Sequence, residues 1–412
     1  MYLFSFAYFG SDVSQYCKIA LSLQIINQSK KNMRDFDQTI DRRQTGSMKW
    51  KRYGDRDVIP MWVADMDYKA APAIQAALQR VTDYGIMGYT LAPQALLDVV
   101  VERLKNQHGW KTVRPEWIVW LPGLVPGLNL ACRTVGTSHD GVMTATPVYF
   151  PFMSSPELSD RTTVKVPMKV ENNRWTLDFW AIEAAIAPNT KMFMLCNPHN
   201  PTGTVFTEDE LNKLTDICIK HNLVLCSDEI HCDLILDETT KHLSVAAIRP
   251  DIEQQSITLL SPSKTFNIAG LGASFAVIPN QQMRERFVQN KLGILPMLSE
   301  YAYEAALAAY QDCEAWRQDL LTYLRRNHDF LLTEINQLNG CKMLPLQATY
   351  LAWVDVQAAG IEDVVGKLEA AGVGVMDGQI FGLGGHIRIN LGCTFEVLQE
   401  AVRRLKTVFT PQ

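Results

Sequence analysis

Short apolar runs recur along the middle of the chain and are separated by longer amphipathic stretches. Each run is apolar on both faces, as is typical of buried parallel strands that helices cover. The stretch 207–221 predicts a helix, because Thr207 can cap its first turn with Glu210 three residues on. Alternating strands and helices predict an α/β domain with a mostly parallel sheet. The runs are Trp117–Leu121, Val142–Thr146, Met192–Cys196, Leu223–Ser227, Ile257–Leu260 and Ser274–Ile278.

The pattern changes after about Pro296. Long helical stretches over 299–336 precede two short strand-like pieces, Tyr350–Val354 and His386–Asn390, which predicts a second, smaller α+β domain. Because every motif described below lies after Met33, we interpret the residues before it as an upstream extension. The predicted organisation is an extension at 1–32, a segment at 33–73 that packs on the small domain, a large domain at 74–296 and a small domain at 297–412.

The composition is that of an ordinary globular protein of 412 residues, 47% hydrophobic and 20% charged. A net charge of -5 argues against nucleic acid as a partner, because phosphate backbones require a basic face. No apolar run reaches the 18 or so residues that predict a membrane span. Nine scattered cysteines without a C-x-x-C pair argue against a disulfide framework or a zinc site. We therefore expect free thiols, no metal and a cytoplasmic location.

A lysine follows one predicted strand, in the stretch Ser261-Pro-Ser-Lys264-Thr-Phe-Asn-Ile-Ala-Gly270. The strand ends at Leu260, so Lys264 is expected at the carboxyl edge of the sheet, where α/β proteins bind ligands. A lysine amine that burial keeps partly deprotonated forms imines with carbonyl compounds. The hydroxyls of Ser261 and Ser263 can serve a phosphate. A surface lysine in a loop is the ordinary alternative, and the motifs at the neighbouring strand ends argue against it.

Two adjacent acids end a second predicted strand, in Ser227-Asp228-Glu229-Ile230-His231. A carboxylate there can pair with a protonated pyridine nitrogen and keep the ring an electron sink. One of two adjacent acids at a strand end usually points to solvent, so we assign Asp228 to the ring and expect Glu229 to face solvent. A buried carboxyl needs a cationic partner to stay ionised. His231 either lies near the ring's phenolic oxygen or is structural.

A third strand end carries the string Asn197-Pro-His-Asn200-Pro-Thr-Gly203. Its two X-Pro steps favour extended conformations at both asparagines. Asn200 can then donate its amide to a phenolic oxygen. The alternative is a rigid turn without a ligand, but the string is long and restrictive, which favours a functional interpretation.

Two weaker motifs complete the set. In Gly123-Leu-Val-Pro-Gly127, a glycine before a helix start offers free backbone N–H groups to a phosphate, although glycine loops are common. In Thr146-Pro-Val-Tyr149, an aromatic ring at a strand end can stack on a cofactor, although a lone tyrosine there is more often part of the packing.

Together these residues resemble the fold type I pyridoxal-phosphate enzymes, the aspartate aminotransferase superfamily. Within it the chain is most similar to the MalY/PatB group of cystathionine β-lyases, also called C–S β-lyases. The resemblance covers about Asp35 to Leu405. The more specific stretches are DRRQTGSMKW (41–50), PMWVADMDY (60–68), GIMGYT (85–90), LPGLVPGLNL (121–130), TPVYFPF (146–152), NPHNPTG (197–203), SDEIHCD (227–233), SPSKTFNIAGL (261–271), TYLAWVD (349–355) and IRINLGC (387–393).

The resemblance implies a role for each matching residue. Lys264 would be the Schiff-base lysine and the acid and base at the substrate Cα. Arg388 would bind the substrate α-carboxylate through two hydrogen bonds, a geometry that only arginine offers. Tyr89 would reach the phosphate in the neighbouring subunit's site, which implies a homodimer with shared active sites. The other implied contacts to pyridoxal 5'-phosphate are Gly123, Leu124, Val125, Ser261 and Ser263 at the phosphate, Asp228 at the pyridine nitrogen, Asn200 and His231 near the phenolic oxygen, and Tyr149 on the ring.

One position favours the lyase branch of this superfamily. Many class I aminotransferases carry a phosphate-binding arginine eight residues after the lysine, whereas this chain has Gly272 there, as the β-lyase group also lacks the arginine. The resemblance therefore implies a lyase that cleaves L-cystathionine or related S-substituted cysteines to a thiol, pyruvate and ammonia. An aminotransferase, which uses the same lysine and aspartate, is one alternative. A cofactor-binding protein with a regulatory role and little turnover is the other.

Overall fold

The large sheet contains eight strands. Its members are β2 (Ile118–Leu121), β3 (Gly141–Thr146), β4 (Thr162–Glu171), β5 (Arg174–Leu177), β6 (Thr190–Cys196), β7 (Val224–Asp228), β8 (Ser256–Leu260) and β9 (Ser274–Val277). They lie in the order β2-β9-β8-β7-β6-β3-β4-β5, and the central strands from β8 to β4 are parallel. The prediction of an α/β fold with a mostly parallel sheet is confirmed. The structure is a computed structural model that describes residues 36–409, so the predicted extension at 1–32 lies outside the described residues.

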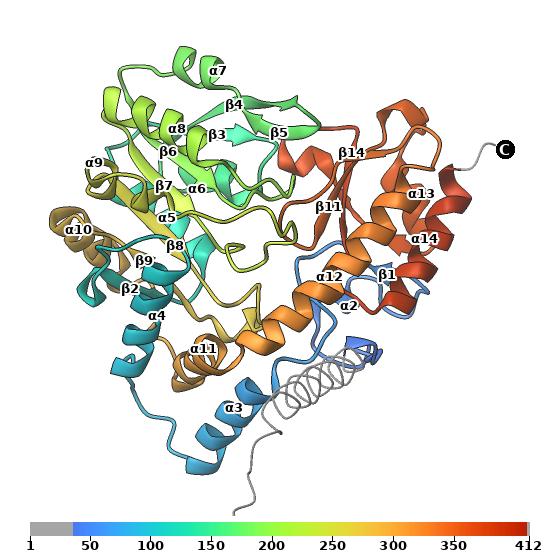
Figure 1. Cartoon of the computed structure of the whole chain (residues 1–412), viewed down its shortest axis with the longest axis horizontal. Helices are drawn as coiled ribbons and strands as arrows, with labels where there is room; N and C mark the ends of the chain where they lie inside the picture. The colour runs from blue at the N-terminus through green and yellow to red at the C-terminus, as the bar shows by residue number, and fades with distance from the viewer. Residues whose placement is uncertain (1–35, 410–412) are drawn as a thin grey trace, which may run out of the picture.

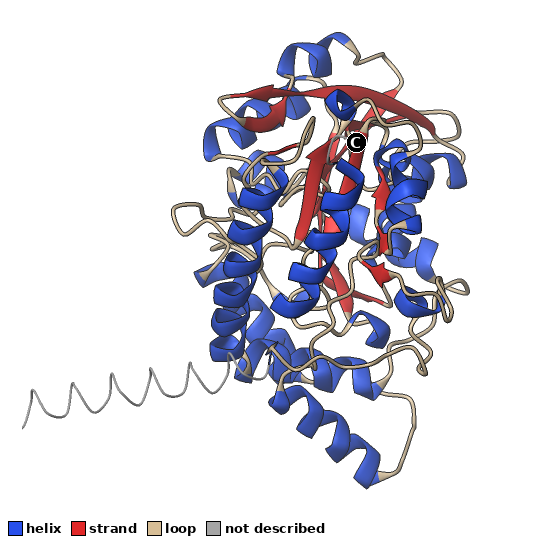
Figure 2. Cartoon of the chain, turned by 90° about the vertical axis from the view of Figure 1, so that its right-hand side faces the viewer, coloured by secondary structure: helices blue, strands red, loops and turns tan. Residues whose placement is uncertain are grey.

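Helices cover both faces of this sheet, as Figures 1 and 2 show. They are α5 (Leu124–Thr134), α6 (Pro151–Leu158), α7 (Phe179–Ala184), α8 (Glu208–Lys220), α9 (Pro250–Glu253) and α10 (Gln281–Lys291). Successive residues of β6 enter different cores, because side chains alternate along a strand. Met192 and Met194 pack with α5 and α10, whereas Phe193 packs with α8. The capping box predicted at Thr207 begins α8.

A group of three helices packs at the β2 and β9 end of the sheet. They are α3 (Pro72–Tyr84), α4 (Gln94–Asn106) and α11 (Glu300–Asp312). Ala302 and Ala305 of α11 are buried in the same hydrophobic cluster as Ile74 of α3. A helix that the sequence places after the predicted domain boundary at 296 therefore shares a core with one from before it. The predicted division into four segments remains a prediction.

A second, antiparallel sheet forms the small α+β layer. Its strands are β10 (Lys342–Met343), β11 (Leu351–Asp355), β13 (Met376–Asp377) and β14 (His386–Asn390), in the order β10-β11-β14-β13. The helices α12 (Glu314–Ile335), α13 (Val364–Ala370) and α14 (Phe395–Phe409) share its hydrophobic core. Among residues 36–409, no helix is both long and apolar enough to cross a membrane.

The segment that follows α2 (Met48–Lys51) belongs to this second core. Its strand β1 (Ile59–Pro60) pairs with β12 (Val373–Gly374) in parallel register. Met61 and Met66 are then buried against the small sheet. The chain continues from there to α3 at the large sheet, and so it crosses from one sheet to the other.

Candidate active site

One cavity of about 370 Å³ lies at the carboxyl ends of β6 and β7, beside β14 of the small sheet. Ligands in parallel α/β sheets bind at this edge. Ser261 and Tyr89, two of the predicted site residues, do not line the cavity. Those that do are Gly123, Leu124, Val125, Tyr149, Asn200, Asp228, His231, Ser263, Lys264 and Arg388.

Lys264 lies in the loop after β8, and its Nζ donates a hydrogen bond to the carbonyl of Ala64 at 2.8 Å. Burial lowers the pKa of this amine from 10.5 to about 8, and the positive charge of Arg388 acts in the same direction. Asp65 and Asp228 oppose the shift without cancelling it. An amine with this pKa is neutral in about one molecule in ten at pH 7. Lys264 can therefore act as a nucleophile and as a base.

Asp228 is the last residue of β7 and is 4% exposed. The backbone N–H of Ile230 donates to its Oδ1 at 3.0 Å. Burial raises the pKa of this carboxyl from 3.8 to about 7, and the nearby charge of Glu229 adds to the increase. A cation that entered the cavity beside Asp228 would restore the ionised form. The carboxyl is thus suited to a protonated ring nitrogen.

Glu229 does not face solvent, and the expectation that it would is wrong. Its side chain is fully buried. It accepts hydrogen bonds from the hydroxyls of Ser227 and Ser244 and from the N–H of Val245, and it lies 3.0 Å from Nε2 of His242. These partners satisfy the carboxylate on the side of the strand away from the cavity, which leaves Asp228 as the acid that lines it.

Asn200, in the loop after β6, meets Arg388 of β14 in the cavity. Arg388 Nη1 donates to Asn200 Oδ1 at 3.0 Å, and its Nη2 donates to the carbonyl of Trp62 at 2.9 Å. Because the oxygen of Asn200 is engaged, its amide nitrogen is the group that can donate to a ligand. Arg388 is 2% exposed, and burial lowers its pKa to about 10. Its Nε has no hydrogen-bond partner among residues 36–409. A buried guanidinium in this state is suited to a carboxylate.

The N-terminus of α5 also lines the cavity. No described side chain caps this helix at Gly123, so its first N–H groups are available to an anion. Ser263 lines the cavity beside them. Ser261 instead donates its hydroxyl to the carbonyl of Ala273 at 2.7 Å and accepts from the N–H of Ser263. The contact of Ser261 with a phosphate stays a prediction. In the structure its hydroxyl stabilises the loop through these two hydrogen bonds.

Tyr149 and His231 also line the cavity. The backbone N–H of Tyr149 donates to the carbonyl of Asn200 at 3.0 Å, which holds the backbone of Tyr149 beside that loop. Burial lowers the pKa of His231 from 6.5 to about 3, with smaller contributions from the charges of Lys264 and Arg388. His231 is therefore neutral. Its Nδ1 is buried without a hydrogen-bond partner in the described part of the chain, so it can still accept or donate one hydrogen bond.

Gly272 lines the same cavity and has a positive φ of 69°. A Cβ at this position would lie 2.8 Å from the carbonyl oxygen of Pro122. Both the backbone conformation and the close approach favour glycine. The arginine that many aminotransferases carry at this position therefore does not fit this loop as it is folded.

A backbone segment that the sequence analysis left without a role forms one wall of the site. Trp62, Val63 and Ala64 line the cavity, and two of their carbonyls accept the hydrogen bonds of Lys264 and Arg388 described above. The stretch PMWVADMDY that contains them is part of the resemblance, but carbonyl contacts depend on tertiary structure and leave no mark on residue type.

The chain is similar to known proteins over nearly all its length. Cystathionine beta-lyase PatB from Bacillus subtilis (strain 168) is 37% identical over 394 residues, which cover 91% of this chain and 100% of that protein. The crystal structure of OvoB has a TM-score of 0.89 and 42% identity and covers 92% of this chain and 99% of its own. Cystalysin from Treponema denticola, whose structure contains pyridoxal 5'-phosphate, has a TM-score of 0.86 and 32% identity, with 91% and 98% covered.

The two sheets, and the lysine loop that meets a buried arginine between them, define an architecture of the fold type I class. The chain belongs to the family Aminotransferase class I and II, whose family model matches residues 56–405. The resemblance to the PatB and MalY group is confirmed by PatB and by Protein MalY from Escherichia coli (strain K12), which is 30% identical over 396 residues that cover 90% of this chain and 98% of that protein.

Proposed function

We propose that the protein is a pyridoxal-phosphate-dependent carbon–sulfur β-lyase. It would convert L-cystathionine or a related S-substituted cysteine, with water, to a thiol, pyruvate and ammonia. The observation that carries the proposal is that Lys264, Asp228 and Arg388 line one cavity, which provides an amine, an acid and a carboxylate receptor for one amino acid. The name of PatB, a cystathionine beta-lyase, supports the choice of substrate.

The residues present fit the cofactor. The uncapped N-terminus of α5 suits the phosphate, and the amide of Asn200 and the unpartnered Nδ1 of His231 suit the phenolic oxygen. Asp228 is buried and forms no ion pair with any of residues 36–409, so a protonated ring nitrogen would supply the partner that its carboxylate needs. Tyr149 would stack on the ring. When bound, pyridoxal phosphate supplies an electron-withdrawing ring that stabilises negative charge at the substrate Cα.

Each polar residue of the cavity then has a task. Arg388 would bind the substrate carboxylate in exchange for its present contact with Asn200, while its Nη2 stays bonded to the carbonyl of Trp62. The free amine of Lys264 would take the proton from the substrate Cα, because a positioned base with a pKa near the working pH is efficient. Asp228 would hold the proton on the ring nitrogen while the thiolate leaves from Cβ.

The rate at which cofactor-free protein captures pyridoxal phosphate is expected to rise with pH and to level off above about pH 8. Only the neutral amine of Lys264 attacks an aldehyde, and burial lowers its pKa from 10.5 to about 8. Absorbance-monitored capture between pH 6 and 10 measures the profile. Nα-acetyllysine, with an ordinary pKa of about 10.4, is the control and should still gain rate above pH 9. A profile of the protein that follows the control would contradict the assigned pKa.

Arg388→Ala is expected to raise the KM for the amino-acid substrate by about 100-fold and to change kcat much less. Removing one partner of a buried, charged hydrogen-bonded pair costs about 2–5 kcal/mol of binding. Arg388→Lys keeps the charge but loses the two-pronged geometry, so it should recover only part of the affinity. Initial rates over a range of substrate concentrations separate the two constants. An unchanged KM in Arg388→Ala would remove the assigned role.

We also propose a homodimer, because the described surface exposes large apolar side chains near α3 and α11. One group of these side chains lies in 84–91, after α3, and the other in 292–297, before α11. The hydroxyls of Thr82 on α3 and Tyr301 on α11 lie 3.1 Å apart, so the two groups are close together. Figure 1 shows the loop from α3 to α4 at the edge of the molecule. Tyr89 in this loop is 98% exposed and outside its own cavity, as a residue that completes the partner's site would be. The exposed side chains are Tyr84, Ile86, Met87, Tyr89, Leu91, Leu292, Ile294 and Met297.

The double variant Ile86→Glu/Leu91→Glu is expected to be a monomer with weakened cofactor binding. Burying two added charges in an apolar interface costs several kcal/mol, on the order of what holds such an interface together. Sedimentation velocity gives the mass, and fluorescence titration gives cofactor affinity. Trp180→Glu is the matched control, because Trp180 is 81% exposed on α7 and should leave the mass unchanged. A double variant that keeps the wild-type mass would exclude this surface as the interface.

Product analysis tests the lyase and separates it from its rival. The lyase releases pyruvate and a thiol from cystathionine with no keto acid present. An aminotransferase would instead convert the bound cofactor stoichiometrically to its pyridoxamine form and stop. If neither pyruvate nor the pyridoxamine form appears, the remaining hypothesis is a cofactor-binding protein with little turnover. We further propose a cytoplasmic location, in keeping with the free cysteines of the described chain.

A further inference from the structure

The segment 62–68, which precedes α3, forms a strap across the active site. The carbonyl of Trp62 accepts from Arg388 Nη2 at 2.9 Å, and the carbonyl of Ala64 accepts from Lys264 Nζ at 2.8 Å. The substrate-binding cation and the reactive amine are thus both held by one short piece of backbone. The position of this piece sets the spacing between the two groups.

Two asparagines attach the strap to the segments that carry Lys264 and Arg388. Asn390, two residues after Arg388 on β14, donates to the carbonyls of Val63 and Asp65 at 2.6 and 2.9 Å. Asn267, three residues after Lys264, donates to the carbonyls of Met66 and Tyr68 at 3.0 and 2.7 Å and accepts from the N–H of Met66. These are the attachments of the strap on the active-site side.

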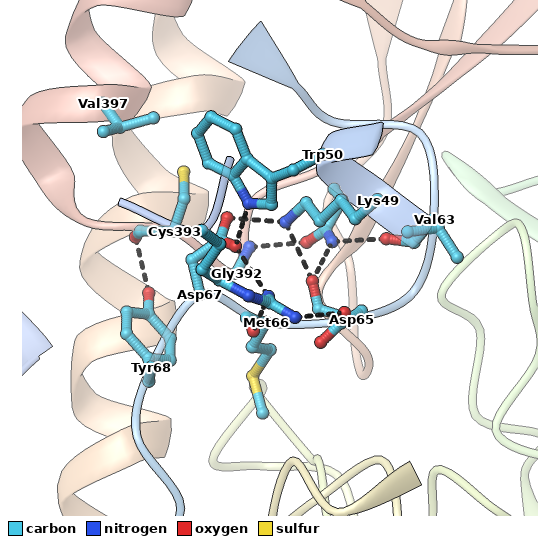
Figure 3. Close-up of polar contacts among 12 residues, drawn as sticks. Lys49, Trp50, Val63, Asp65, Met66, Asp67, Tyr68, Gly392, Cys393 and Val397 are labelled. Atoms are coloured by element: carbon cyan, nitrogen blue, oxygen red, sulfur yellow. Dashed lines mark hydrogen bonds and ion pairs between the residues drawn. The ribbon is translucent and has the colours of Figure 1, made fainter. Parts of the chain in front are cut away.

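A cluster of mostly charged residues outside the cavity also fixes the strap. Figure 3 shows Lys49 and Trp50 pointing toward Asp65 and Asp67. Lys49 Nζ contacts Asp67 Oδ2 at 2.6 Å and the carbonyl of Asp65 at 2.9 Å, and Trp50 Nε1 donates to Asp67 Oδ1 at 3.1 Å. Arg42 bridges both carboxylates, at 3.0 Å each. Asp67 thus receives three charged or polar donors from the segment 42–50.

The burial of Lys49 makes this arrangement specific. Its side chain is 1% exposed, and its amine finds partners in Asp67 and in the carbonyl of Asp65. In return the backbone carbonyl of Lys49 accepts from Trp62 Nε1 at 3.0 Å, which ties the start of the strap to α2. The N–H of Asp67 donates to the carbonyl of Gly392 at 2.9 Å. Each end of the strap is therefore tied down outside the cavity.

We propose that Asp67, with Arg42, Lys49 and Trp50, is a positioning cluster that holds the strap so that Lys264 and Arg388 stand at the spacing one amino-acid substrate requires. None of the four touches Lys264 or Arg388 through a hydrogen bond of the described structure. They act through the carbonyls of Trp62 and Ala64. The inference rests on the proposed function for the tasks of Lys264 and Arg388.

The test uses the double variant Lys49→Met/Asp67→Asn, which removes the buried pair without leaving one charge uncompensated. Amide hydrogen exchange of the segment 61–68 is expected to accelerate at least about tenfold. The KM for the amino acid should rise by about tenfold or more, because small displacements of substrate-positioning groups are costly. Capture of pyridoxal phosphate by the cofactor-free variant should slow by a similar factor. Trp50→Phe removes one hydrogen-bond donor only and should show smaller changes in hydrogen exchange, KM and cofactor capture. If the double variant does not fold, this single variant tests the positioning role.

The matched control is Arg174→Met/Glu210→Gln, which removes a partly buried pair that does not line the cavity. It should lower stability without changing exchange in 61–68, KM or cofactor capture. If the Lys49/Asp67 variant folds and behaves like this control, the cluster is merely structural and the proposal is overturned. Pyruvate release by the wild-type protein tests the lyase proposal separately from the role of the cluster. If the wild-type protein released no pyruvate, the lyase proposal would be overturned, whereas hydrogen exchange and cofactor capture would still decide the role of the cluster.

Discussion

Lys264→Ala is expected to abolish the borohydride-trapped covalent link to pyridoxal phosphate and to lower kcat by at least about 1,000-fold. The methyl group cannot attack the cofactor aldehyde, and it cannot take the proton from the substrate Cα. A positioned base alone contributes about 100- to 10,000-fold, and covalent capture adds to this. The fold should persist, because among residues 36–409 the amine makes one hydrogen bond, to the carbonyl of Ala64, and its burial is unfavourable for the charged form.

Mass spectrometry after borohydride treatment measures the covalent link, and pyruvate release measures turnover. Lys291→Ala is the matched control, since Lys291 is also partly buried, also has a lowered pKa and also donates to a backbone carbonyl, that of Trp120 at 2.7 Å. It should keep both trapping and activity. Trapped cofactor in Lys264→Ala at the wild-type level would place the imine on another residue.

The sequence could predict the large sheet because its signal is local. Runs such as Met192–Cys196 are apolar on both faces, and this pattern belongs to strands covered by helices on both sides. Parallel strands bring their carboxyl ends to one edge, so the polar residues after β6, β7 and β8 had to lie near one another. This reasoning led to Asn200, Asp228 and Lys264 in one cavity.

Features that depend on tertiary contacts could not be predicted in this way. Glu229 is an acid at a strand end, yet three hydrogen-bond donors and His242, all provided by the fold, make it a buried residue. The wall formed by Trp62 and Ala64 acts through carbonyl groups, which every residue has. The helical pattern over 299–336 does not locate the break between α11 and α12 at Cys313, which is set by where each helix packs.

Because Asp228 is buried, its ionisation depends on whether the cofactor is bound. Without a cation, burial raises the pKa of the carboxyl to about 7, so the cofactor-free protein at neutral pH contains both forms. A protonated ring nitrogen against the carboxylate lowers that pKa and raises the pKa of the nitrogen in turn, because each charge stabilises the other. Cofactor binding and ionisation of Asp228 are therefore linked.

Asp228→Asn is expected to lower kcat by about 100- to 1,000-fold, the second largest effect that we predict. The amide has the shape of the carboxyl but no charge, so it cannot keep the ring nitrogen protonated, and the loss of such a charge-assisted contact costs about 3–4 kcal/mol in the transition state. The variant should still form the trapped link to Lys264, because that step does not use the ring nitrogen. Activity and trapping together therefore separate a defect in electron withdrawal from a defect in binding.

The neighbouring acid provides the control, since Glu229→Gln removes one charge one residue away on the other side of β7. Glu229 does not line the cavity, so this variant should lose stability through its buried hydrogen bonds and keep most of its kcat. Pyruvate release, measured per mole of trapped cofactor, corrects for any loss of folded protein. Equal losses of kcat in the two variants would mean that net negative charge near the strand end matters rather than contact with the ring. A large loss confined to Asp228→Asn would place the ring nitrogen at that carboxyl, because only its side chain reaches the cavity.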